Sequence, residues 1–181
     1  MGLDMYISAE KYIGGWNHGK DKIFDKMCKL IGVTPTNESP SISVDVTVGY
    51  WRKANAIHSW FVKNVQDGKD ECQKSHVTRE QLQELKDDCL KVLNSVETVE
   101  GTIKEGKTFY GDGRVEQHTR TGPVVAQTKL AESILPTQSG FFFGGTDYDE
   151  YYLQDLKNTV EIIDRCLAME ESWSFNYRAS W

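Results

Sequence analysis

The most regular pattern along the chain is the alternation of apolar and polar side chains at residues 41–48. A period of two residues is typical of a β-strand with one buried face. The same alternation at residues 3–10 predicts an N-terminal strand, and residues 173–178 predict a C-terminal strand. Together the three segments predict a small, mainly antiparallel sheet.

Apolar residues recur at helical spacing in four other segments: 22–30, 51–65, 82–96 and 152–167. Gly49 is expected to turn the chain sharply where the central strand gives way to the second of these helices. Thr78 and Gln81 have the spacing of a capping box, which predicts that the third helix starts there. Either Thr146 or Asp147 is expected to cap the last helix.

The segment at residues 99–123 has a weaker pattern and five glycines. Strand-like pieces at 106–110 and 114–119 flank Gly111-Asp112-Gly113 and predict a hairpin. We interpret the segment as an inserted hairpin or mobile excursion and not as a second domain. The whole chain, residues 1–181, is therefore predicted to be one α+β domain, with its sheet covered by three or four helices.

The composition limits the partners. The net charge is −6 at pH 7, whereas proteins that bind extended nucleic acids usually carry a basic surface. A local cationic site for one phosphorylated ligand is compatible with this charge. The four cysteines stand singly, with no histidine beside them at metal-ligand spacing, so we expect no metal and no cofactor. Without a signal-peptide pattern or a long apolar run, the chain is expected to be cytoplasmic, with no membrane partner.

Polar residues follow the central strand at a spacing that predicts one polar edge on the next helix. Arg52 and Asn55 lie about one turn apart, and His58 stands at the border of the apolar face. Arginine offers a fork of donors and asparagine both donates and accepts, so the pair can hold a planar or anionic group. Trp51 adds an aromatic surface. In the alternative interpretation Arg52 pairs with a carboxylate, while Trp51 and His58 belong to the packed interior.

A glycine-rich loop before the last predicted helix is the second candidate site. Gln138 and Ser139 precede glycine, which leaves backbone amides accessible, and Phe141 opens a run of three phenylalanines. The loop contains no lysine and does not match a P-loop. A phenylalanine outside the core can stack on a ligand or contact a partner. The alternative is a buried turn with an aromatic plug.

Asp4 and Tyr6 share one face of the N-terminal strand. We expect Arg178 or Tyr177 of the last strand to line the same face. A carboxylate together with His58 would serve acid–base chemistry if the two met. The sequence contains no nucleophile elbow, zinc-protease helix or cysteine–histidine signature. The sequence therefore favours a non-enzymatic function, and an enzyme stays open as the alternative.

Three stretches of the chain resemble a group of small phage and prophage proteins without an assigned activity: Met1–Tyr6, Val48–His58 and Leu135–Gly144. The resemblance covers most of the chain, and residues 99–123 are the part least like the group. It implies a phage-encoded protein that acts inside a bacterial host cell. Small accessory phage proteins often counter host defences, and one route is to bind and hide a nucleotide signal.

These observations lead to three functional hypotheses. The first is a non-enzymatic protein that binds a small nucleotide-like ligand or, in the stronger form of the hypothesis, sequesters it; the ligand's identity and a homo-oligomeric state stay open. The second is a nucleotide-processing hydrolase or transferase that uses His58 with Asp4 or Tyr6. The third is an interaction module that inhibits a host enzyme. The residues expected to contact the ligand are Asp4, Tyr6, Trp51, Arg52, Asn55, His58, Gln138, Ser139 and Phe141.

Overall fold

The computed structural model describes residues 2–14, 22–34, 41–140 and 142–181 of the 181-residue chain. Its strands are β1 (Asp4–Gly14), β2 (Ser41–Arg52), β3 (Ser75–Val77), β4 (Thr98–Phe109), β5 (Val115–Val125) and β6 (Ser174–Ser180). Its helices are α1 (Lys22–Ile31), α2 (Asn55–Asn64), α3 (Arg79–Ser95), α4 (Lys129–Ile134) and α5 (Glu150–Leu167). The architecture is α+β with antiparallel sheets, which confirms the fold class predicted from the sequence.

The larger sheet has the strand order β2-β1-β6-β3, and each neighbouring pair is antiparallel. The predicted central, N-terminal and C-terminal strands are β2, β1 and β6. The edge strand β3 is not predicted, because three residues are too few to show an alternating pattern.

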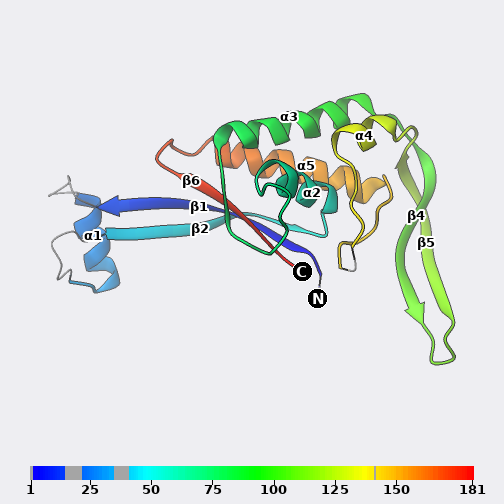
Figure 1. Cartoon of the computed structure of the whole chain (residues 1–181), viewed down its shortest axis with the longest axis horizontal. Helices are drawn as coiled ribbons and strands as arrows, with labels where there is room; N and C mark the ends of the chain where they lie inside the picture. The colour runs from blue at the N-terminus through cyan, green and yellow to red at the C-terminus, as the bar shows by residue number, and fades with distance from the viewer. Residues whose placement is uncertain (1, 15–21, 35–40, 141) are drawn as a thin grey trace.

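This sheet buries one face and exposes the other. The buried face of β1 contributes fully buried apolar side chains: Met5, Ile7 and Ala9. It packs against α2, α3 and α5, which Figure 1 shows gathered along one side of the strands. The other face, called the open face below, carries the intervening side chains of β1: Asp4, Tyr6, Ser8 and Glu10. Rigid strands thus present a row of polar and aromatic groups to solvent.

The predicted turn at Gly49 is wrong, because β2 continues through Arg52. A Cβ atom on Gly49 would lie 2.4 Å from Cγ2 of Ile162 and 2.8 Å from Cγ2 of Ile7. Glycine therefore lets α5 approach the sheet closely instead of turning the chain. The turn comes at Lys53, whose φ is 60°. Trp51 and Arg52 consequently lie in a strand, with their side chains on opposite faces.

The helix starts are set by side-chain caps. Thr78 and Gln81 form the predicted capping box at the start of α3. The predicted cap of the last helix is wrong: Asp149, and neither Thr146 nor Asp147, accepts the backbone N–H groups of Tyr151 and Tyr152. The helix starts at Glu150, so the earlier residues are too far from its first free N–H groups. The six-residue α4 was not predicted.

The predicted hairpin is formed by β4 and β5, and it is longer than its strand-like pieces suggest. Figure 1 shows it projecting from the helices at the end of the molecule opposite α1. Ile103 is fully buried, and Val125 donates its backbone N–H to Tyr148. These contacts fasten the base of the hairpin beside α5. Towards the tip, Phe109 is 75% exposed.

Candidate functional site

Asn55 lies at the first turn of α2 and is buried. Its side-chain nitrogen donates to the carbonyl oxygens of Phe143 at 3.0 Å and Gly145 at 2.7 Å. Its side-chain oxygen accepts the backbone N–H of Gln138 at 2.9 Å. The structure thus brings Asn55 and the predicted loop together. The amide of Asn55 holds that loop and is not presented to solvent.

His58 is fully buried one turn further along α2. Its Nδ1 lies 2.8 Å from the Tyr177 hydroxyl, and its Nε2 lies 3.0 Å from Oδ2 of Asp70. Tyr177 belongs to the buried face of β6, whereas Asp4 and Tyr6 belong to the open face. The sheet therefore separates His58 from both expected acid–base partners. His58 thus does not meet Asp4 or Tyr6, a contact that the hydrolase or transferase hypothesis requires.

Trp51 is also part of the interior. Its indole Nε1 donates to the hydroxyl of Thr159 on α5 at 2.9 Å. Its ring meets that of Phe61 edge-on, with centroids 6.1 Å apart. Trp51 therefore fastens α5 and α2 to β2, as the packing interpretation expects.

Few side chains of the glycine-rich loop are exposed for contact with a ligand. The Gln138 side chain is half-buried, and Ser139 is exposed. Phe141 lies outside the described residues. Phe143 is buried and packs edge-on against His58, with ring centroids 5.1 Å apart.

The remaining predicted residues meet on the open face, where two neighbours join them. We call this group the tyrosine–arginine cluster: Asp4, Tyr6, Tyr50, Arg52 and Arg178. The strand register places Tyr6 opposite Tyr50 on one side and opposite Arg178 on the other. Asp4 lies opposite Arg52. Three strands therefore position five side chains in one area of the open face.

The two tyrosine rings of the cluster lie side by side. Their centroids are 5.3 Å apart and their planes are inclined by 43°. Tyr6 is 38% exposed and Tyr50 is 44% exposed. The Tyr50 hydroxyl donates to Oδ1 of Asp4, and this bond raises the pKa of Tyr50 above its ordinary value. The ring of Tyr50 is therefore held in place by its own hydroxyl.

Three positively charged side chains lie at this end of the sheet: Arg52, Lys53 and Arg178. Nη1 of Arg52 lies 3.1 Å from Oδ1 of Asp4. Arg178 forms no ion pair or hydrogen bond through its side chain within the described part of the chain. Lys53 follows Arg52, and both side chains lie beside Gly2. Arg52 pairs with Asp4, whereas Arg178 lies on the neighbouring strand opposite Tyr6, so cationic side chains gather here although the whole chain carries a net charge of −6.

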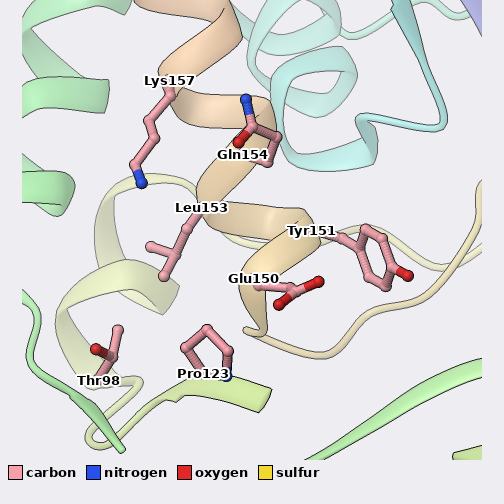
Figure 2. Close-up of a pocket in the computed structure, with 7 residues that line it drawn as sticks. All are labelled: Thr98, Pro123, Glu150, Tyr151, Leu153, Gln154 and Lys157. Carbon is pink, nitrogen blue, oxygen red and sulfur yellow. The ribbon is translucent and has the colours of Figure 1, made fainter. Parts of the chain in front are cut away.

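A hollow of about 470 Å³ lies elsewhere, between the base of the hairpin and the first turns of α5 (Figure 2). Its lining residues come from β4, β5 and α5: Thr98, Pro123, Glu150, Tyr151, Leu153, Gln154 and Lys157. None of them was predicted as a site residue. No local motif signals this hollow, because strand ends and a helix form it only after folding.

The described histidine, cysteine and acidic residues are dispersed, and the thiol of Cys166 is buried. Within the described ranges, no group of three or more histidine, cysteine or acidic residues is arranged to hold a metal ion. All four cysteines are free, and burial raises the pKa of the Cys166 thiol to about 11. Cys166 is therefore protonated at neutral pH and is a poor nucleophile.

Sequence reasoning missed Tyr50 and underrated Arg178 as site residues. Tyr50 was assigned to a turn and helix start, so its strand face was not considered. The strand of residues 41–48 continues to Arg52, but a β-bulge opposite Ile7 and Ser8 exchanges the faces of its even- and odd-numbered residues. The alternation alone would have placed Tyr50 and Arg52 together on the apolar face of Val44 and Val46, whereas the bulge turns both side chains to the open face.

Comparisons with models of protein families, with curated proteins and with solved structures found no match for this chain. Among the described residues, no helix has both the length and the apolar character needed to span a membrane.

Proposed function

We propose that this protein binds a small nucleotide-like ligand on the open face, at the tyrosine–arginine cluster. The observation that carries the proposal is the pair of half-exposed rings of Tyr6 and Tyr50 beside the guanidinium of Arg178, which has no partner among the described residues. Aromatic rings stack on the faces of nucleobases, and arginine pairs with phosphate through two parallel hydrogen bonds. The stacking ring of Tyr6 and the guanidinium of Arg178 lie on neighbouring strands, so one ligand can reach both.

The roles within the cluster follow from its contacts. Tyr6 offers the ring for stacking, and Arg178 binds the phosphate because its side chain has no competing partner among the described residues. Asp4 holds Tyr50 and Arg52 in place, and its second carboxylate oxygen can accept a hydrogen bond from a base or ribose. Stacking on one tyrosine contributes about 1–3 kcal/mol per base.

The shape of the site limits the affinity. A pocket usually buries most of a small ligand, whereas a sheet face leaves one side of the ligand in water. We therefore expect affinities in the micromolar range for a mononucleotide, and tighter binding for a ligand with two bases. The resemblance to phage and prophage proteins supports a role inside an infected bacterium, where the ligand would be a nucleotide signal withheld from a host defence.

Isothermal titration calorimetry with a panel of mononucleotides, linear dinucleotides and cyclic dinucleotides tests the proposal. We expect at least one of them to bind with one-to-one stoichiometry in the micromolar range or tighter. Mass spectrometry of the recovered ligand should show it unchanged. Failure of the whole panel to bind at this level would end the proposal.

An inhibitor of a host enzyme is the second candidate, favoured by the hairpin tip. Phe109 and Val115 are register partners there, and both side chains are mostly exposed. Exposed aromatic residues are common anchors of protein–protein interfaces. One stoichiometric partner captured from a host extract by the wild type, and lost with Phe109→Ser, would favour this function over ligand binding.

A further inference from the structure

The hollow at the base of the hairpin combines an apolar floor with polar walls. Leu153 is largely buried, and it forms the floor together with Pro123. Figure 2 shows Leu153 and Lys157 projecting from the same side of α5. Residues four positions apart share one helix face, which explains this alignment. The volume of about 470 Å³ suits a molecule built around a single ring.

The polar groups of the hollow differ in whether they already have partners. Glu150 is ion-paired with Arg120, which also binds Glu105. The ammonium of Lys157 and the side-chain amide of Gln154 form no hydrogen bond or ion pair within the described residues. One cation and one amide are therefore free to bind a ligand.

The nature of the free groups selects the chemistry of the ligand. The first N–H groups of α5 are capped by Asp149, so the helix end adds no anion site. Arg120 is occupied by two carboxylates, which leaves Lys157 as the free cation lining the hollow in the described part of the chain. A phosphate dianion prefers several donors or cations, whereas a monocarboxylate is matched by one ammonium and one amide. The apolar floor adds a preference for a ring.

We infer that this hollow is a second binding site, which takes a small aromatic carboxylate. The ring lies on Leu153 and Pro123, and the carboxylate pairs with Lys157 and accepts a hydrogen bond from Gln154. This inference is independent of the tyrosine–arginine cluster, because the two sites share no residue.

Nuclear magnetic resonance titration of the full chain tests the site. The probes are benzoate, its neutral analogue benzamide, and inorganic phosphate. We expect benzoate to shift the backbone amide signals of Thr98, Leu153, Gln154 and Lys157 in a saturable way. Benzamide should bind at least about ten-fold more weakly, because a paired charge is lost. Phosphate should leave these signals unchanged at equal ionic strength.

Two variants decide whether Lys157 carries the binding. Lys157→Met keeps most of the side-chain length and should weaken benzoate binding about ten-fold or more, whereas Lys157→Arg should retain it. Lys91→Met, which removes an exposed lysine from α3, is the matched control and should bind benzoate like the wild type. Absence of saturable shifts at the hollow, equal binding of benzamide, phosphate shifting the same signals, or full binding by Lys157→Met would each overturn the inference.

Discussion

Asn55 accepts the backbone N–H of Gln138 through its side-chain oxygen, at 2.9 Å, and its nitrogen donates to two carbonyl oxygens of the same loop. The sequence suggests that Asn55 and Gln138 contact a ligand, but in the structure Asn55 uses its side chain to hold the loop of Gln138 in place. Because the amide of Asn55 is occupied by the loop backbone, the ligand site that we propose lies on the opposite face of the sheet.

Asn55→Ala should destabilise the protein by about 2–4 kcal/mol, because it removes three hydrogen bonds and leaves the buried carbonyl of Phe143 and two part-buried backbone groups without their partner. Chemical denaturation measures the change in the free energy of unfolding. Asn158→Ala is the control, since the Asn158 side chain makes one long 3.5 Å bond to Tyr50 and should change stability by less than about 0.5 kcal/mol. An Asn55→Ala variant as stable as this control would contradict the assigned role.

Tyr177→Phe should destabilise the protein by about 1–2 kcal/mol. The substitution removes the hydroxyl that lies 2.8 Å from His58 but keeps the ring, which stacks on Phe61 at 3.9 Å between centroids. Thermal unfolding followed by circular dichroism measures the loss. Tyr12→Phe, at an exposed position, is the control. Equal melting temperatures for the two variants would show that the buried bond to His58 contributes nothing.

Gly49→Ala should destabilise the protein by about 1–3 kcal/mol through overpacking. The new methyl group would meet Cγ2 of Ile162 at 2.4 Å. Gly106→Ala is the matched control, because a Cβ atom there has no neighbour within 4 Å. The double variant Gly49→Ala/Ile162→Ala should lose less stability than the sum of the losses measured for the two single variants. Strict additivity would mean that α5 does not press on Gly49.

Asp155 should make stability depend on pH. Burial, together with the nearby Asp149 carboxylate, raises the pKa of Asp155 from its ordinary value of 3.8 to about 7 in the folded protein. The folded state thus favours the protonated acid, so its contribution is fully present below about pH 4 and is lost as the pH rises through about 7.

The variant Asp155→Asn removes this titration. It should raise the free energy of unfolding at pH 8 by about 1–3 kcal/mol and change it little at pH 4. Denaturation at several pH values measures both effects. Glu161→Gln, at an exposed position of the same helix, should show no such trend. An equal effect of Asp155→Asn at pH 4 and pH 8 would refute the raised pKa.

The fold could be predicted in outline because its strands alternate and its helices carry regular apolar stripes. Gly49 misled the prediction, since the sequence cannot distinguish a glycine that turns the chain from one that admits a neighbouring helix. His58 was similarly ambiguous, because its partner Tyr177 comes from the last strand and its partner Asp70 from an irregular segment after α2. The face shared by Asp4 and Tyr6 followed from the period of a strand. The hollow near Lys157 did not, because packing alone forms it.

The most direct test of the proposed function compares the variants Tyr6→Ala and Tyr12→Ala in calorimetric titration with the best ligand of the nucleotide panel. Both tyrosines lie on the open face of β1, but Tyr12 stands at the far end, away from the tyrosine–arginine cluster. We predict that Tyr6→Ala weakens binding at least about ten-fold through lost stacking, while Tyr12→Ala binds like the wild type. Equal affinities for the two variants would contradict a ligand site at the tyrosine–arginine cluster.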